Sequence, residues 1–380
     1  MIARERHGAR IRVDAMAIAA PGYDVIVRHG ALAELGERIA AAAPAAAYAV
    51  ITPHSIHETV GARALADLRA AGLHAELLAF DDREVNKTRE TWAALTDRML
   101  ELRFGRDSCV VAVGGGVTGD VAGFVAATYM RGIPFVQVPT TLLAMIDASI
   151  GGKTGVDTHA GKNLVGAFHS PAVVVIDPSV LETLPALHIQ SGLAEAVKHG
   201  AILDAAYFEW IASNARDLLA LDASALEHLI ARSVELKAGI VSADPREDGR
   251  RAILNFGHTI AHALERYAGY TMSHGAAVSV GMCAEAAVGE AVGTTNAGTA
   301  QALRSLLSTL GLPTRSGFDP AALLDTMAID KKSRAARPRF ALLRSIGECA
   351  VDTNGMWTHA IDSQVLKRVL EETAVAHDRV

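Results

Sequence analysis

The first half of the chain alternates short apolar runs with longer segments in which apolar residues recur three and four positions apart. The short runs are rich in valine and isoleucine and predict strands, namely 11–13, 23–27, 48–51, 74–80, 109–113, 135–138 and 173–176. The longer segments between them, such as 31–43 and 88–102, predict helices. This alternation predicts an α/β Rossmann-like fold, in which a doubly wound parallel sheet carries helices on both faces.

The pattern changes after Pro178, where helical periodicity dominates. One segment places Leu226, Leu229, Ile230 and Val234 on a single helix face, and the next strand-like run is 339–343. A chain of 380 residues also exceeds the roughly 250–300 residues at which single cores stop growing. We therefore expect an α/β domain over residues 1–177 and a mainly α-helical domain over 178–380, with an active site in the cleft between them.

Composition narrows the class of protein. The formal net charge of −6 disfavours a nucleic-acid partner, and no apolar run reaches the ~18 residues of a membrane span. The cysteines are odd in number and widely spaced, which favours reduced core residues over a disulfide framework. The N-terminal arginines are interrupted by acidic residues, and no apolar signal core follows them. These observations favour a cytoplasmic enzyme.

Two glycine-rich stretches suggest anion binding. The run 109–113 ends in the triplet Gly114, Gly115 and Gly116, and a helical pattern follows. A strand, a glycine turn and a helix start can cradle a phosphate, because the backbone approaches closely and the helix offers free N–H groups. A glycine triplet is also typical of an ordinary tight turn. The stretch 151–163 adds two lysines and an asparagine among glycines, which predicts either a second anion site or a flexible solvated loop.

The second half contains a candidate metal site. Glu195 and Lys198 are three residues apart, a spacing that a surface ion pair would also show. His258 and His262 lie one helical turn apart, and His274 follows. Imidazole together with carboxylate favours zinc or a similar divalent ion. By spacing alone, His258 and His262 are the natural pair of ligands.

From about Tyr23 to Gly347 the chain resembles the 3-dehydroquinate synthases, within the wider sugar phosphate cyclases. The stretches that carry the resemblance are 114–120, 139–155 and 161–163. It implies conversion of 3-deoxy-D-arabino-heptulosonate 7-phosphate to 3-dehydroquinate and phosphate, a step of the shikimate pathway. It also implies NAD that is regenerated in each turnover, a divalent metal (zinc or cobalt), and a homodimer in which Arg131 reaches across the interface.

The same resemblance implies roles for individual residues. It implies that Glu195, His258 and His274 are the metal ligands and that His262 binds substrate. The catalytic residues that it implies are Asp147, Lys198 and His262. Those implied for substrate binding are Arg131, Lys153, Asn163, Lys237, Arg251, Asn255, Lys331 and Lys332, with one of the last two expected to reach the phosphate. Those implied for NAD are Glu84, Lys87, Gly114, Gly115, Gly116, Val117, Asp120, Thr140, Thr141, Leu143, Lys162 and Thr183.

Two departures from the family pattern fall on the cofactor side. The family usually has an aspartate near Pro53, for the adenosine ribose, and an Arg-Glu pair where Leu187 and His188 stand. Three alternatives remain at this stage: a cyclase acting on sedoheptulose 7-phosphate, a metal-dependent alcohol or glycerol dehydrogenase, and a non-catalytic module. Lys237 and Arg251 match the family's carboxylate-binding residues and favour the heptulosonate. Arg251 is expected on one helix with His258, sharing its face.

Overall fold

The computed structural model describes residues 3–5, 8–13, 22–332 and 339–374. Its contacts divide the chain into two compact units. The first unit comprises Met1–Leu184 and Ala223–Pro245, and the second comprises Pro185–Asp222 and Arg246–Val380. The expected boundary after Asp177 differs from this division. The carboxylate of Asp177 accepts hydrogen bonds from the backbone N–H groups of Gly30, Leu32 and Ser179, so the turn that follows it stays with the first unit.

An eight-stranded sheet forms the centre of the first unit. Its strands are β1 (Ala3–Glu5), β2 (Gly8–Val13), β3 (Tyr23–Val27), β4 (Ala47–Pro53), β5 (Ala75–Phe80), β6 (Ser108–Gly114), β7 (Phe135–Pro139) and β10 (Val173–Ile176). The order across the sheet is β1-β2-β3-β10-β7-β6-β4-β5. The six strands from β3 to β5 are parallel, while β1 and β2 pair antiparallel at one edge. The predicted doubly wound parallel sheet is therefore confirmed.

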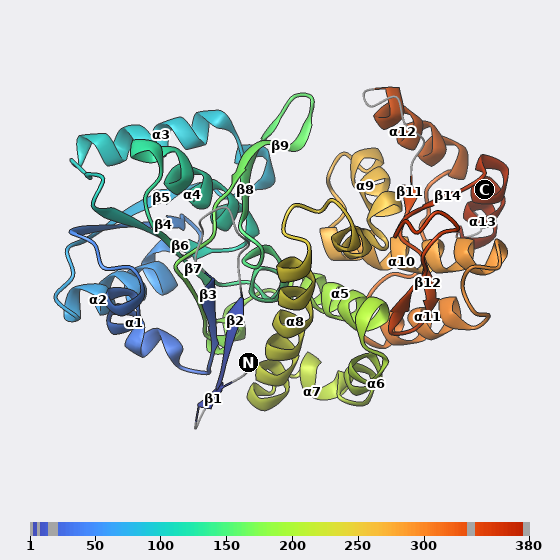
Figure 1. Ribbon diagram of the computed structural model, residues 1–380, viewed down its shortest axis with the longest axis horizontal. Helices are drawn as coiled ribbons and strands as arrows, with labels where there is room; N and C mark the ends of the chain where they lie inside the picture. Colours follow the sequence, from blue (N-terminus) through green and yellow to red (C-terminus); the bar gives the residue numbers. More distant parts are fainter. Residues whose placement is uncertain (1–2, 6–7, 14–21, 333–338, 375–380) are drawn as a thin grey trace. The chain divides into compact units, whose positions relative to one another are not determined.

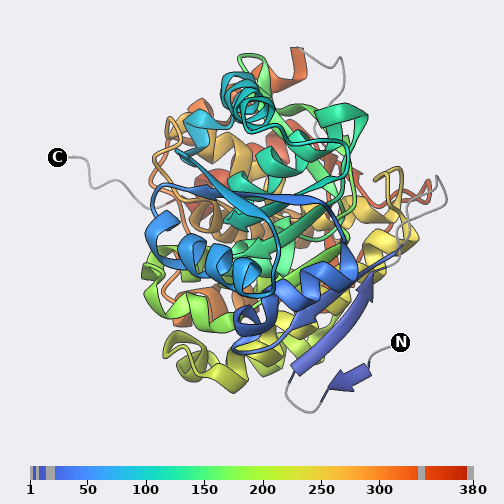
Figure 2. The same cartoon turned by 90° about the vertical axis from the view of Figure 1, so that its left-hand side faces the viewer.

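Helices cover both faces of this sheet (Figures 1 and 2). Helices α1 (Leu35–Ala42) and α2 (Ala62–Ala70) pack on one face, where Leu35 and Leu68 join Val111 in a buried cluster. Helices α3 (Arg89–Glu101) and α4 (Gly116–Thr128) pack on the other, where Met99 joins Val110. Successive residues of β6 thus serve opposite faces, and both of these neighbouring valines are fully buried. A strand buried on both sides explains the continuous apolar runs in the sequence.

Two further elements complete the first unit. Strands β8 (Lys153–Thr158) and β9 (Gly161–Phe168) form an antiparallel hairpin that extends away from the sheet (Figure 1). Helix α8 (Ala223–Ala243) packs on β2 and on the π-helical turn Ala144–Ala148. The glycine-rich stretch is thus an ordered hairpin, and the flexible-loop interpretation is wrong.

The second unit is mainly helical, as expected. Its helices are α5 (Ala186–Leu203), α6 (Ala205–Ser213), α7 (Ala215–Leu219), α9 (His258–Tyr267), α10 (His274–Ala291), α11 (Thr299–Thr309), α12 (Pro320–Lys332) and α13 (Ser363–Thr373). Four short strands pair in two antiparallel sets: β11 (Arg339–Phe340) with β14 (His359–Ala360), and β12 (Leu343–Ser345) with β13 (Glu348–Cys349). Among the described residues, no helix is both long and apolar enough to cross a membrane. All three cysteines of the chain are buried and unbonded, as predicted.

One local prediction is confirmed and another is wrong. The helix predicted over 88–102 is α3, which begins at Arg89 after the 3-10 turn Glu84–Asn86, with the Thr88 hydroxyl accepting a hydrogen bond from the Thr91 N–H. Arg251 is not on the same helix as His258. It lies in the separate 3-10 turn Arg250–Asn255, because Gly257 adopts a left-handed φ of +82° that interrupts the helical path.

Candidate functional site

The predicted phosphate cradle is the junction of β6 and α4. Gly115 precedes the first helical residue and provides no side-chain cap, so the helix N–H groups there are available to an anion. A Cβ on Gly114 would lie 2.4 Å from the Thr118 hydroxyl, and a Cβ on Gly115 would lie 3.2 Å from the Thr141 methyl group. Glycine at these positions thus lets the turn pack closely against Thr118 and Thr141. The uncapped N–H groups of the helix start fit the pyrophosphate of a dinucleotide.

The position of this turn in the sheet supports the same assignment. From β4 the chain leads through α2 on one face to β5, and from β6 it leads through α4 on the other face to β7. The order of strands therefore reverses between β4 and β6. In open α/β sheets, ligands bind outside the carboxyl ends of the strands at such a switch point. Pro53, the departure from the family pattern, is the last residue of β4 and lies at this same edge.

Lys87 connects the cradle to the hairpin. Its ammonium lies 2.5 Å from Asp120 Oδ2 on α4 and 2.5 Å from Asn163 Oδ1 on β9, and the residue is only 4% exposed. Burial raises the pKa of Asp120, and the positive charge of Lys87 opposes that rise. Lys87 thus links Asp120, which is predicted to bind NAD, to Asn163, which is predicted to bind substrate.

A residue that the sequence did not reveal shapes the hairpin. The Asp157 carboxylate accepts a hydrogen bond of 2.8 Å from the backbone N–H of Asn163, which has a left-handed φ of +56°. The Lys162 ammonium lies 2.9 Å from Glu84 Oε1. These two residues, both predicted to bind NAD, therefore form an ion pair. Lys153 starts β8 and is exposed.

The remaining predicted residues of the first unit fall into three groups. The Lys237 ammonium of α8 contacts the Asp147 carboxylate and lies 2.6 Å from the Asp147 carbonyl oxygen, so a predicted substrate-binding residue is in contact with a predicted catalytic one. Arg131 and Thr183 lie on exposed turns, outside these contacts. The third group lies around the cradle. It consists of Val117 on α4, Thr140 after β7, and Leu143 before the π-helical turn.

The second unit brings the predicted metal ligands together. Glu195 on α5 is fully buried, and its Oε1 lies 3.5 Å from His258 Nε2 and 3.3 Å from His274 Nε2. One donor atom from each residue lies within 4.8 Å of the others. Two imidazoles and a carboxylate are a donor set that suits zinc.

The second ring nitrogen of each histidine is also engaged. His258 Nδ1 lies 3.2 Å from the Phe256 carbonyl oxygen, and His274 Nδ1 lies 3.1 Å from Glu265 Oε1. An Nδ1–H that donates to such an oxygen leaves a lone pair on Nε2, which here faces the Glu195 carboxylate. A ring nitrogen and a carboxylate oxygen that face each other in this way can share a cation, either a proton or a metal ion, so the geometry fits a metal. Glu265 was not predicted, and its position two helical turns after His258 is the one signal that could have indicated it.

The electrostatics of the cluster agree with this assignment. Burial, assisted by Lys198, lowers the pKa of His258 to about 3 and keeps its ring neutral. Burial alone would lower the pKa of His274, but hydrogen bonds to Glu195 and Glu265 raise it to about 10. The two carboxylates therefore favour positive charge at this point.

The second unit also carries the other predicted residues, of which Lys198 and His262 lie beside the cluster. Lys198 is 1% exposed and forms an ion pair with Glu195. The His262 ring lies 5.5 Å from the His258 ring, edge to face, and Arg251 is 2% exposed. The Asn255 amide donates to Glu247 Oε1 at 2.8 Å, a partner that was not predicted. Lys331 and Lys332 end α12, and their side chains lie outside the described part of the structure.

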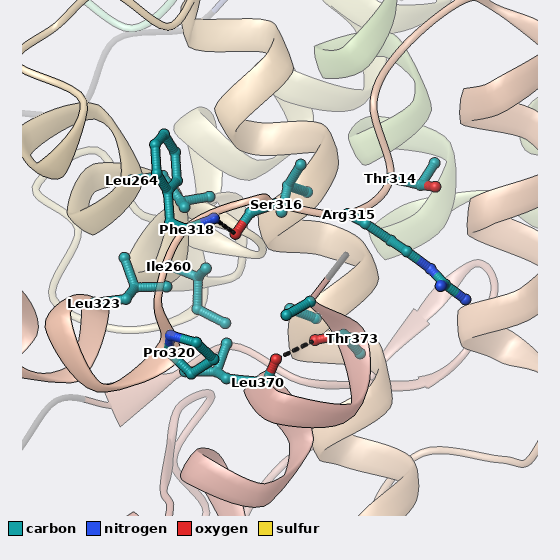
Figure 3. Close-up of a pocket in the computed structure, with 13 residues that line it drawn as sticks. Ile260, Leu264, Thr314, Arg315, Ser316, Phe318, Pro320, Leu323, Leu370 and Thr373 are labelled. Atoms are coloured by element: carbon teal, nitrogen blue, oxygen red, sulfur yellow. Dashed lines mark hydrogen bonds between the residues drawn. The ribbon is translucent and has the colours of Figure 1, made fainter. Parts of the chain in front are cut away.

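A small pocket lies against α9 and α10 (Figure 3). Apolar residues such as Ile260, Leu264 and Leu323 line it, and the Arg315 side chain extends away from them. Its volume of about 10 Å³ has room for about one water molecule at most. None of the predicted site residues lines it, so it is not the candidate site.

Comparisons with known proteins agree with the geometry. A family model described as 3-dehydroquinate synthase N-terminal matches residues 77–191, and one described as 3-dehydroquinate synthase C-terminal matches residues 192–333. A 3-dehydroquinate synthase from Pelobacter propionicus is 42% identical over 331 residues, which cover 87% of this chain and 92% of the relative.

Two solved structures share the fold at 26% identity. One is a 2-deoxy-scyllo-inosose synthase in complex with carbaglucose-6-phosphate, NAD+ and Co2+, with a TM-score of 0.87 and coverage of 96% of this chain and 100% of that one. The other is a 2-epi-5-epi-valiolone synthase from Streptomyces hygroscopicus with NAD+ and Zn2+ bound, with a TM-score of 0.84 and coverage of 94% and 98%. The glycine cradle, the Glu-His-His cluster and the extent of the sequence match lead to one conclusion: the chain belongs to the 3-dehydroquinate synthase family.

Proposed function

We propose that this enzyme converts 3-deoxy-D-arabino-heptulosonate 7-phosphate to 3-dehydroquinate and phosphate, with NAD and a divalent metal as cofactors. The observation that carries the proposal is the cluster of Glu195, His258 and His274, in which both histidines turn Nε2 toward one buried carboxylate. Its presence in a chain of this family favours the full reaction over mere retention of the fold.

In this proposal Glu195, His258 and His274 would hold zinc or cobalt. When bound, such an ion would act as a Lewis acid and lower the pKa of a substrate hydroxyl. Lys198, buried beside Glu195, would add positive charge close to that hydroxyl. His262, one turn further along α9, would hold a second hydroxyl.

The first unit would hold NAD on the N-terminus of α4 and on the side chains around it. When bound, NAD would supply the transient hydride acceptor that lets phosphate leave by elimination and the carbocycle close afterwards. Lys87, held by Asp120, would keep the cradle next to the hairpin that carries Asn163. Thr140 and Thr141, at the end of the neighbouring strand, would line the cradle's other side.

Charged and amide side chains would orient the substrate. Its phosphate would contact cations and amides, namely Lys153, Asn163, Arg131, Asn255 and one of Lys331 and Lys332. Its carboxylate would contact Lys237 and Arg251. Asp147, Lys198 and His262 would hold hydroxyls and move protons between them. Lys237 already contacts Asp147, so its ammonium is fixed before the carboxylate arrives.

The direct test is release of phosphate from the heptulosonate. We expect release to require both NAD and a divalent ion, to stop on chelation, and to resume when zinc or cobalt is added. Product should form in large molar excess over NAD, since the cofactor is regenerated. Accumulation of one NADH per product would contradict the proposal and indicate a dehydrogenase.

Substrate choice provides the first quantitative prediction, for the substitution Arg251→Ala. Sedoheptulose 7-phosphate lacks the carboxylate, so in this proposal it would not form the contact with the guanidinium of Arg251, which is 2% exposed. Removing one side of such a pair typically costs about 2–5 kcal/mol, which is roughly 30- to several-thousand-fold in kcat/KM. Arg251→Ala should therefore lose most of the preference for the heptulosonate. Comparable kcat/KM for the two substrates in the unmodified protein would move the assignment to the other cyclases.

We also propose a cytoplasmic homodimer. Leu164 and Phe168 lie on one face of β9 and are 48% and 61% exposed, an apolar surface that a second copy would cover. The three buried, unbonded cysteines are consistent with a reducing compartment. Sedimentation equilibrium should give twice the chain mass, and Phe168→Glu should lower it toward that of a single chain.

A further inference from the structure

A buried carboxylate outside the predicted site, that of Glu285, caps the helix that carries two of the site histidines. Glu285 lies on α10 and is 0% exposed. Its Oε2 accepts a hydrogen bond of 2.8 Å from the Gly257 N–H, and its Oε1 accepts one of 3.2 Å from the Ile260 N–H. The backbone N–H of Thr259 also bonds to this carboxylate. Glu285, on a neighbouring helix, thus accepts the hydrogen bonds of the free backbone N–H groups at the start of α9.

The local geometry explains why the cap comes from elsewhere. The residue before α9 is Gly257, which has no side chain to offer, and the helix has no side-chain cap of its own. A Cβ on Gly257 would lie 2.7 Å from Met282 Cγ and 2.9 Å from the Met282 nitrogen, both on α10. A Cβ on Gly281 would lie 2.0 Å from the Gly257 carbonyl oxygen. The two helices are therefore in backbone contact, and glycine at both positions lets Glu285 reach the α9 terminus.

This cap links two of the three candidate ligands. His258 is the first residue of α9, directly after Gly257, and His274 is the first residue of α10, the helix that carries Glu285. The carboxylate thus sets the start of α9 relative to α10, and with it the place of His258 beside Glu195. Burial raises the pKa of Glu285 to about 8 although backbone N–H groups oppose that rise. A charged residue is therefore costly here, and packing alone would favour an apolar one.

We propose that Glu285 is a positioning residue that fixes the first turn of α9, so that His258 meets Glu195 and His274 in the geometry that a divalent ion requires. The inference rests on the proposed function in one respect, because it takes these three residues as the metal ligands. It adds a contact that acts on the metal through the helix backbone.

The chain offers a matched control on the same helix. Glu290, five residues further along α10, accepts a hydrogen bond of 2.9 Å from the Ala300 N–H in the first turn of α11. That helix also follows a left-handed glycine, Gly298, and has no side-chain cap of its own. The two glutamates thus make the same kind of contact, but α11 carries no candidate ligand. Glu290→Ala therefore measures the effect of losing a helix cap that has no connection to a candidate metal ligand.

The experiment measures zinc and cobalt dissociation constants of the full-length protein by competition with a chelator. We expect Glu285→Ala to weaken binding about 10- to 100-fold, the range typical of losing an outer partner of a metal ligand. Glu285→Gln keeps one acceptor oxygen and should weaken binding less. Glu290→Ala should lower the melting temperature and leave the dissociation constant unchanged. An unchanged constant in Glu285→Ala, or an equal loss in Glu290→Ala, would overturn the proposal.

A second measurement serves if Glu285→Ala does not fold. Hydrogen exchange of metal-free Glu285→Gln should be faster at the amides of 257–260 than in the unmodified protein, and unchanged at the start of α11. Equal protection at 257–260 would overturn the proposal. Absence of metal binding in the unmodified protein would instead contradict the proposed function, which keeps the two failures distinguishable.

Discussion

At the scale of single residues, the site depends on what lies behind each ligand. His258 and His274 both turn Nε2 toward Glu195, but the second nitrogen of His258 meets a backbone carbonyl while that of His274 meets the Glu265 carboxylate. Only the second of these outer partners can be removed by a side-chain substitution. Glu265 is 5% exposed, so its carboxylate is buried.

We predict that Glu265→Ala weakens zinc binding about 10- to 100-fold, because His274 loses the acceptor that fixes its tautomer and ring orientation. Calorimetric titration of the metal-free protein would measure this. Glu265→Asp, which keeps a carboxylate on a shorter side chain, should recover part of the affinity. Full affinity in Glu265→Ala would show that the His274–Glu265 contact has no such role.

Glu285 leads to a prediction about pH. Its folded-state pKa of about 8 lies above the 4.5 of an unperturbed glutamate, so between these values the folded protein holds a proton that the unfolded chain has released. The stability that this group contributes therefore falls as pH rises from about 4.5 to about 8, by up to ~1.4 kcal/mol per pH unit, and is constant above that. Urea unfolding from pH 5 to 9 should show that the free energy of unfolding of Glu285→Gln rises relative to that of the unmodified protein over that range. A difference that does not change with pH would contradict the raised pKa.

The sequence could predict part of this site but not its supporting residues. Spacing favours His258 and His262 as a pair, since they lie one turn apart on α9. The structure places His258 and His274 against Glu195, and the His262 ring lies edge to face with that of His258. Spacing cannot decide such a question, because it gives the face of one helix and not the helix opposite. Asp157, Glu265 and Glu285 were missed for the same reason.

At the scale of elements, periodicity predicted the central strands well and the glycine-rich segments poorly. The runs that became β4, β6, β7 and β10 are apolar and β-branched, so their pattern was clear. The β8–β9 hairpin was missed because glycine is depleted in strands. Here the glycines allow close approach, since a Cβ on Gly166 would lie 2.1 Å from the Thr154 carbonyl oxygen across the hairpin.

A glycine at a helix crossing provides the element-scale prediction. A Cβ on Gly275, one residue after His274, would lie 2.2 Å from Ser191 Cα on α5, the helix that carries Glu195. Backbone cannot rotate away, so Gly275→Ala should cost about 1–3 kcal/mol or more of unfolding free energy and should weaken metal binding. Urea denaturation and chelator competition measure the two effects.

Gly239→Ala is the matched control for that substitution. Gly239 lies on α8, is exposed, and a Cβ there would meet nothing within 4 Å. The change should stabilise the protein by about 0.4–1 kcal/mol. Equal unfolding free energies for the two variants would show that the α5–α10 crossing tolerates a side chain.

At the scale of the whole molecule, the sequence predicted two domains but not which residues belong to each. Helix α8 falls in the predicted helical domain, yet its apolar side chains and Lys237 complete the first unit. Leu226 and Val234 are buried there. An amphipathic pattern indicates that a helix covers some apolar surface, and it does not identify which one.

The corresponding prediction concerns fragments. Residues 1–184 alone should be poorly soluble or molten, because they expose the surface that α8 covers. Residues 1–184 joined through a flexible linker to 223–245 should unfold cooperatively in urea. Equal, cooperative unfolding of both fragments would show that α8 is dispensable to the first unit.

The interrupted first unit also matters during synthesis. A ribosome that has reached Leu184 has made the whole sheet but not α8, and Pro245 follows about 60 residues later, which takes about 3–12 s at typical elongation rates. During that interval Asp147 has no Lys237 to contact, and the apolar surface under α8 is open to other chains. We therefore expect the nascent protein to depend on chaperones most strongly in this window. Slow codons between 185 and 245 would lengthen that exposure.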